Sequence, residues 1–228
     1  MNLSTIRDRR FLVLLSTLAI GLVVQSLNRG FVASTLLAEG LLVVALLVVF
    51  WVVFERTRQR LATLAAAALA IILSGAHHFL AGPQQLELAL AFHGLMMVFL
   101  GWAAVQILRG LFAGRVARAD DVLGALCAYL IAGWAWANLY ALTELLVPGS
   151  FSVSADIRNE LAAWHDRQAL FTYYSFVTLT TVGYGDMTPV RAPATTIVLA
   201  EAVFGQFYVA IVVAQIVGMR LAQALKPH

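Results

Sequence analysis

The distribution of apolar residues constrains this chain more than any other feature. Six apolar runs alternate with short connectors, and they cover residues 11–27, 35–54, 61–80, 86–108, 122–147 and 194–218. A helix needs about 20 predominantly apolar residues to cross the hydrocarbon core of a bilayer. Hydrophobic residues make up 61% of the 228 residues and charged residues only 12%, whereas a typical soluble domain is about 25% charged. We therefore expect an all-α membrane protein with six transmembrane helices.

The positions of Lys and Arg predict the orientation. The connectors at 1–10, 55–60, 109–119 and 220–228 hold three, three, three and two of these residues, which is 11 of the 15 in the chain. Short cytoplasmic loops carry an excess of basic residues. We therefore expect both termini in the cytoplasm and the protein in the plasma membrane. The net charge of +3 is explained by this topology, so no nucleic acid partner is expected.

Two segments leave alternatives open. The first apolar run follows a basic start, which is also typical of a signal peptide. It has no Ala-x-Ala pattern near its end, so a retained helix is favoured. The basic connector at 109–119 is compatible with an interfacial helix on the inner leaflet or with a solvated loop.

Residues 166–180 are too short and too polar to cross a membrane, and a helix there is tolerated only where protein surrounds it. We expect the preceding residues 150–165 to form a polar outer loop with a short helical piece around 156–164. The chain then reads Thr-Leu-Thr-Thr-Val-Gly-Tyr-Gly-Asp over residues 178–186. Glycine reaches positive φ at no Cβ cost. The alternation of Gly183 and Gly185 with Val182 and Tyr184 therefore lets successive carbonyl groups turn the same way, as a dehydrating cation requires.

This stretch resembles the selectivity filter of the potassium channel family, and the resemblance covers about residues 120–220. It implies a pore domain at 120–228, made of an outer helix, a re-entrant pore helix, the filter and an inner helix. By the same resemblance, transported K⁺ ions are held by the filter residues Thr181, Val182, Gly183, Tyr184 and Gly185, and no organic cofactor is expected. A ring of carbonyls needs four such segments, and the motif occurs once. The resemblance thus implies a homotetramer embedded in membrane lipid.

Three residues are expected to support the filter. The side chain of Tyr184 should point away from the pore axis, towards Tyr173 and Tyr174 of the pore helix. Asp186 resembles the carboxylate at the outer mouth of the family's pore, where it raises the local cation concentration. To clamp the filter, Asp186 would need a hydrogen-bond donor, and the sequence does not identify one.

The inner helix carries residues with two interpretations each. Gly205 lies where the family often has a hinge glycine, but close helix packing also selects glycine. Gln206, Val209 and Val213 share one helical face, which lines either the cavity or a packed core. Glu201 is an intramembrane carboxyl group, and such groups are functional candidates by default. We expect its partner in the pore helix or filter backbone, in a structural role or as a titratable gating group.

Residues 1–119 are expected to form a four-helix transmembrane domain that ends in a basic connector. Voltage sensors carry regularly spaced arginines in their fourth helix, yet residues 61–108 contain no Lys or Arg. The sequence therefore predicts no steep voltage gating. His77, His78 and His93 with Glu87 suggest an extracellular proton sensor, since histidine titrates near neutral pH. Hydrogen bonds within the helix bundle are the alternative explanation of these histidines.

Taken together, these features favour a potassium-selective channel that conducts passively. A potassium transporter subunit and a non-conducting regulatory channel subunit are the alternatives. An enzyme is not expected, because the sequence has no nucleophile with a paired base, no metal-ligand spacing and no phosphate-binding loop.

Overall fold

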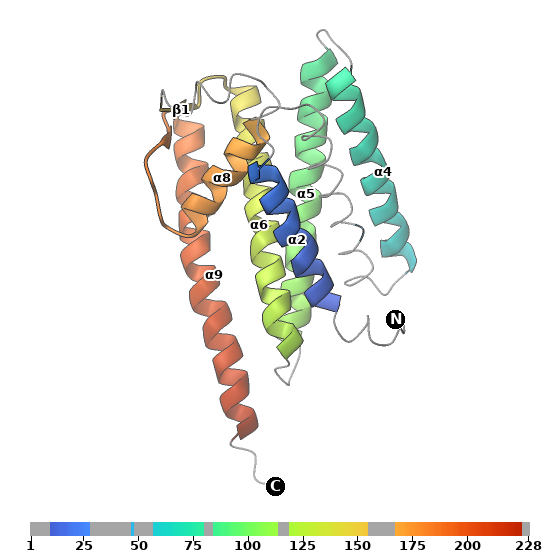
Figure 1. Ribbon diagram of the computed structural model, residues 1–228, viewed down its shortest axis with the longest axis vertical. Coiled ribbons are helices and arrows are strands. Elements are labelled where there is room, and N and C mark those ends of the chain that lie inside the picture. Colours follow the sequence, from blue (N-terminus) through green and yellow to red (C-terminus); the bar gives the residue numbers. More distant parts are fainter. Residues whose placement is uncertain are drawn as a thin grey trace.

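The computed structural model describes residues 10–27, 47, 57–79, 84–113, 119–154 and 167–224. The part of the chain that it describes is mostly helical (Figure 1). The helices are α2 (Arg10–Leu27), α4 (Thr57–Phe79), α5 (Gln84–Ala113), α6 (Ala119–Leu146), α8 (Arg167–Leu179) and α9 (Ala192–Ala224). Two short strands, β1 (Phe151–Val153) and β2 (Met187–Pro189), pair in antiparallel fashion with Val153 opposite Met187.

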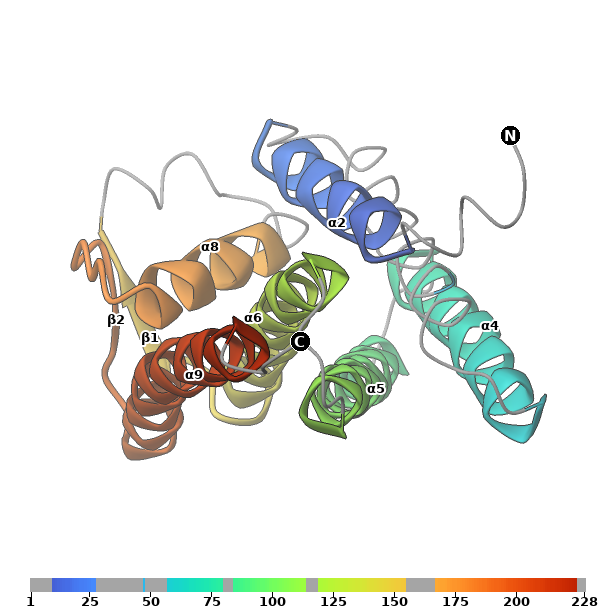
Figure 2. The ribbon, with the colours of Figure 1, turned by 90° about the horizontal axis from the view of Figure 1, so that it is seen from below.

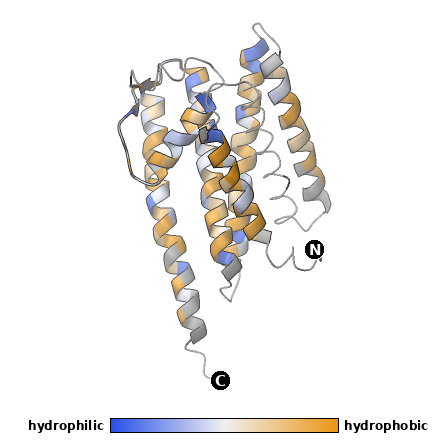
Figure 3. Cartoon of the chain, in the orientation of Figure 1, coloured by the Kyte–Doolittle hydropathy of each residue, from blue (hydrophilic) through white to orange (hydrophobic). Residues whose placement is uncertain are grey.

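Three of the described helices are long and apolar enough to cross a membrane. These spans cover Gln84–Phe112 in α5, Asp121–Leu146 in α6 and Ala192–Val212 in α9, while α2 and α4 carry shorter apolar stretches. Hydrophobic colours dominate the long helices in Figure 3. Because a helix satisfies its backbone hydrogen bonds internally, it is one of the few structures that lipid tolerates. The chain is therefore a helical membrane protein.

The helices pack around α6. Seen from below in Figure 2, α5 separates α6 from α4, while α8 and α9 lie on the other side of α6 and α2 covers a third side. The main core joins α2, α5 and α6 through buried side chains such as Leu14, Met96 and Ile131. A second cluster at the level of the strands joins Tyr140 of α6 to Phe171 and Tyr174 of α8. This arrangement holds the short helix α8 between α6 and α9.

The helix predicted at 166–180 is present, since α8 covers Arg167–Leu179. Other boundaries differ. α4 begins at Thr57, inside the predicted charged loop at 55–60. α5 continues to Ala113, five residues past the predicted end, because Leu111 packs on the core and one glycine costs a helix only about 1 kcal/mol. α9 includes Pro193, since the first turn of a helix needs no N–H from that position.

Several predicted segments lie outside the described residues. One is the second apolar run at 35–54, of which only residue 47 is described. The others are the helical piece at 156–164 and residues 114–118 of the basic connector. The β1–β2 pair was not predicted, because strands of three residues have no periodicity to read.

Candidate functional site

The filter stretch continues directly from the end of the pore helix. The amide of Thr180 donates to the Phe176 carbonyl at 3.0 Å. The carbonyl oxygen of Val177 accepts hydrogen bonds from the amides of Val182 at 3.0 Å and Gly183 at 3.4 Å. These bonds tie the first residues of the filter to the last turn of α8. Any displacement of α8 therefore moves the filter as well.

The backbone of the filter alternates in the sign of φ. Thr181, Gly183 and Gly185 have φ of 59°, 56° and 78°, whereas Val182 and Tyr184 are not among the residues with positive φ. Positive φ was predicted at the two glycines but not at Thr181. A non-glycine residue in this region is uncommon and costs on the order of 1–3 kcal/mol. All five residues are exposed in the single chain, which leaves this backbone open on one side.

Tyr173 supplies the donor that Asp186 lacked in the sequence analysis. Its hydroxyl donates to Oδ2 of Asp186 at 2.5 Å, and Oδ1 accepts the Met187 amide at 2.9 Å. The rings of Tyr173 and Tyr184 lie parallel, with centroids 6.5 Å apart. One pore-helix tyrosine thus contacts both the filter and the carboxylate that follows it.

Tyr174 has a different role from the one expected. Its ring packs on Tyr140 at 5.3 Å and on Phe151 at 5.8 Å, and it makes no ring contact with Tyr184 among the described residues. Adjacent residues on a helix point about 100° apart, so one pore-helix tyrosine faces the filter while the other packs in the core. Among the described ring contacts, Tyr173 is the tyrosine of α8 that meets Tyr184.

An unpredicted turn lies beside the outer end of the filter. The Glu144 carboxylate accepts hydrogen bonds from the amides of Gly149, Ser150 and Phe151, at 3.0, 2.9 and 3.3 Å. This turn leads from α6 into β1, and β1 pairs with β2 immediately after Asp186. A glutamate just before the Pro148-Gly149 break was the available signal.

Glu201 lies in the interior of the pore module and not on its surface. Its side chain is 0% exposed. The Ser175 hydroxyl of α8 contacts Oε1 at 2.5 Å, and the Tyr140 hydroxyl of α6 donates to Oε2. The structure thus places a polar group of the pore helix where one was expected, and it adds a second partner from the outer helix.

Gly205 packs directly on the end of the pore helix. A Cβ atom there would lie 2.5 Å from the carbonyl oxygen and 3.1 Å from the Cα of Leu179. Side-chain contacts below 3.0 Å to rigid backbone force a displacement, so the contact accounts for this glycine without a hinge. Gln206 and Val209 are exposed in the single chain, and the side chain of Val213 lies outside the described residues.

Of the three histidines considered as a proton sensor, only the side chain of His93 lies within the described residues. Nδ1 of His93 lies 2.9 Å from Oδ1 of Asn138, whose amide nitrogen donates to the Trp134 carbonyl. Since that amide oxygen can only accept, Nδ1 of His93 carries the hydrogen. Glu87 is exposed, and the side chains of His77 and His78 lie outside the described residues. His93 is therefore bonded within the bundle, as the alternative interpretation held.

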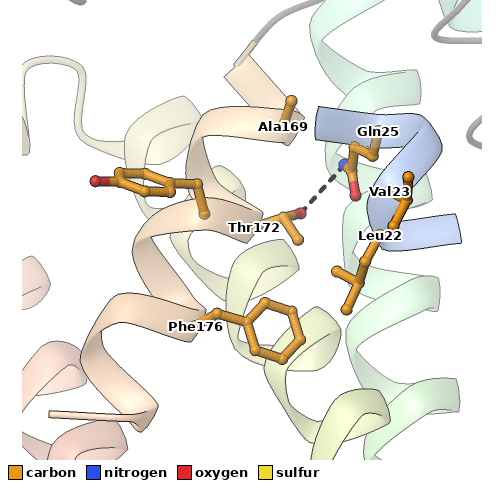
Figure 4. A pocket seen from close by; sticks show the side chains of 7 residues that line it. Leu22, Val23, Gln25, Ala169, Thr172 and Phe176 are labelled. Carbon is orange, nitrogen blue, oxygen red and sulfur yellow. Dashed lines mark hydrogen bonds between the residues drawn. The ribbon is translucent and has the colours of Figure 1, made fainter. Parts of the chain in front are cut away.

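A cavity of about 310 Å³ separates α2 from the pore helix. Figure 4 shows Gln25 of α2 reaching Thr172 of α8 across it; its Nε2 donates to the Thr172 hydroxyl at 3.2 Å. Oε1 of Gln25 accepts from the Trp134 indole at 3.3 Å. One amide thus joins α2, α6 and α8, so the first described helix packs on the pore module of its own chain.

Comparison with known proteins gives one match. Residues 125–220 match the model of a family described as ion channel. This segment contains most of α6, the pore helix, the filter stretch and most of α9, and it is 96 of the 228 residues. No curated protein and no solved structure matches the chain. The family match supports an ion channel.

Proposed function

We propose that this protein is a potassium-selective channel that conducts K⁺ passively across the plasma membrane. The observation that carries the proposal is the backbone of residues 181–185, which alternates in the sign of φ and is suspended from a short helix between α6 and α9. Carbonyl oxygens aligned along such a backbone replace the hydration shell of an entering ion. The filter residues Thr181, Val182, Gly183, Tyr184 and Gly185 are the proposed K⁺ ligands.

Four copies of the chain complete the pore in this proposal. The filter is exposed in one chain, and irregular backbone at membrane depth is tolerated only where protein or a water-filled cavity surrounds it. Only 17% of the α9 span is buried within the chain, against 39% for α5 and 56% for α6. Its exposed apolar residues, among them Val203, Phe207 and Ile211, are available to neighbouring subunits. A homotetramer around the ion path accounts for both features.

The remaining expectations enter the proposal unchanged. The proposed channel has six transmembrane helices and cytoplasmic termini, and it contacts membrane lipid. It is proposed to have no enzymatic activity and no nucleic acid partner. The proposed channel has no steep voltage dependence, because residues 61–108 carry no Lys or Arg. Gln206, Val209 and Val213 are proposed to face the cavity below the filter.

Single-channel recording in planar bilayers tests the proposal. We expect unitary currents whose reversal potential follows the potassium gradient. Gly183→Ala should abolish them, because an L-residue is strained at φ 56°. Gly101→Ala in α5 is the control, because it adds the same methyl group outside residues 125–220, and nothing lies within 4 Å of the added Cβ in the chain.

Three outcomes would contradict the proposal. Equal permeability to sodium would remove potassium selectivity. Slow, saturable flux would indicate a transporter subunit, and an assembled protein without flux would indicate a non-conducting regulatory subunit.

A further inference from the structure

The pore helix and the inner helix meet at matched positions. Glu201 and Gly205 lie one turn apart on α9, and they contact Ser175 and Leu179, which lie one turn apart on α8. Residues four apart share one face of a helix. Figure 2 shows α8 lying beside both α6 and α9. The two contacts therefore fix the position of α8 along α9.

Glu201 belongs to a chain of three contacts between oxygen atoms. The Tyr140 hydroxyl contacts Oε2 of Glu201, and Ser175 Oγ lies 2.5 Å from Oε1. The same Oγ lies 2.8 Å from the carbonyl oxygen of Gly133 in α6. Glu201 and Ser175 are both 0% exposed. The contacts must therefore be satisfied by the hydrogens of these groups themselves.

Counting hydrogens decides the form of the carboxyl group. Each of the three contacts requires one hydrogen, and a carbonyl oxygen supplies none. The Tyr140 and Ser175 hydroxyls supply two. If Glu201 were ionised, one close pair of oxygens would have no hydrogen between them. A neutral carboxyl group supplies the third: it donates to Ser175, which then donates to Gly133, while Tyr140 donates to the other carboxyl oxygen.

The surroundings of Glu201 also favour the neutral form. Among the described residues, the titratable groups that face it are Tyr140 and Tyr129 from α6 and Tyr174 from α8. Within the described residues no Lys, Arg or His pairs with it, and Arg220 is the other charged residue of α9. An ionised carboxylate taken out of water without a cation is strongly disfavoured.

We propose that Glu201 is a neutral carboxylic acid that links α6, α8 and α9 and thereby positions the selectivity filter. The link reaches the filter through α8, because Val177, two residues after Ser175, accepts the amide hydrogen bonds of Val182 and Gly183. This inference rests on the proposed channel function and makes Glu201 a positioning residue. It does not line the path of the ion.

Four variants of the full chain test the inference. Glu201→Gln preserves every contact, because its amide donates to Ser175 and its carbonyl accepts from Tyr140. Glu201→Leu and Ser175→Ala break the chain of hydrogen bonds. Glu87→Gln is the matched control, since it removes the same carboxyl chemistry at an exposed position. The K⁺/Na⁺ permeability ratio is measured in planar bilayers, and the infrared spectrum of the wild type is compared with that of Glu201→Gln.

We expect Glu201→Gln and Glu87→Gln to keep the wild-type permeability ratio. Glu201→Leu and Ser175→Ala should lower it about tenfold, the equivalent of one lost buried hydrogen bond. The infrared difference should show the C=O band of a carboxylic acid. If Glu201→Leu does not assemble, Ser175→Ala decides, because it removes only one hydroxyl group.

Two results would overturn the inference. One is a carboxylate band in place of the acid band, together with a Glu201→Gln variant that loses selectivity as Glu201→Leu does. The other is full selectivity in both Glu201→Leu and Ser175→Ala. A wild-type protein that passes no potassium would refute the channel itself, whereas the infrared band would still decide the state of Glu201.

Discussion

Replacement of Gly205 by alanine distinguishes close packing from a hinge. The added Cβ would lie 2.5 Å from the carbonyl oxygen, 3.1 Å from the Cα and 3.2 Å from the carbonyl carbon of Leu179. All three atoms are backbone at the end of α8, so no side-chain rotation relieves the overlap. Inserting such a group into a packed interior typically costs about 1–3 kcal/mol.

Helix propensity acts in the opposite direction. Alanine stabilises a helix interior by about 1 kcal/mol relative to glycine. Gly218→Ala, on the same helix, gains this term without a clash, because nothing lies within 4 Å of its added Cβ in the chain. The difference in unfolding free energy between the two variants therefore isolates the contact with Leu179, and we expect it to be about 1–3 kcal/mol.

Titration of the purified protein with a denaturing detergent, followed by the loss of helical circular dichroism, measures this difference. Gly133→Ala provides an intermediate case. Its Cβ would meet ring atoms of Phe176 at 2.6 and 2.7 Å, and a ring can rotate away where a backbone cannot. A Gly205→Ala protein as stable as Gly218→Ala would refute the packing argument and restore the hinge interpretation.

Three other changes probe separate contacts. Tyr173→Phe keeps the ring beside Tyr184 but removes the hydrogen-bond donor to Asp186. A hydrogen bond to a charged group is worth about 1.5–3 kcal/mol, so potassium currents should decay faster during sustained recording. Unchanged currents would count against a role of the Tyr173–Asp186 bond in holding the filter. Gln25→Leu leaves the Trp134 indole without its Gln25 acceptor. It should lower the free energy of unfolding by about 1–3 kcal/mol in the same detergent titration. An unchanged free energy of unfolding would show that the Gln25 hydrogen bonds contribute nothing to stability. His93→Gln should leave the dependence of the current on pH between about 5 and 8 unchanged, because His93 is bonded to Asn138 inside the bundle; a lost pH response would revive the sensor hypothesis.

The sequence predicted the elements that hydrophobicity and length determine. α6 and α9 coincide with apolar runs, and α8 was recognisable because a short polar segment precedes the glycine alternation. The boundaries of α4 and α5 were less predictable. Charged residues near the ends of these helices favoured a loop prediction. Helix α5 nevertheless continues past Arg109, because Leu111 packs against the hydrophobic core. Where apolar periodicity ends, the end of a helix depends on tertiary contacts that a sequence does not display.

The contacts that hold the filter were less predictable than its residues. The Tyr173–Asp186 bond joins residues 13 apart, the Ser175–Glu201 bond 26 apart and the Tyr140–Glu201 bond 61 apart. Such pairs follow from how α6, α8 and α9 pack, which no local pattern encodes. Gly205 shows the same limit, because its sequence position fits a hinge as well as a contact.

Several contacts around the filter stretch come from its own chain, whereas the proposed ring of ligands needs other chains. Tyr173 bonds Asp186, Glu144 holds the turn before β1, and Gly205 seats the end of α8, all without a second copy. The exposed surfaces of the filter and of α9 are the surfaces that neighbouring subunits would cover in the proposed tetramer. Support and assembly are therefore separable. Changes in Tyr173 or Glu201 should alter conduction in particles that still assemble, whereas changes on the exposed face of α9, such as Phe207, should alter assembly first.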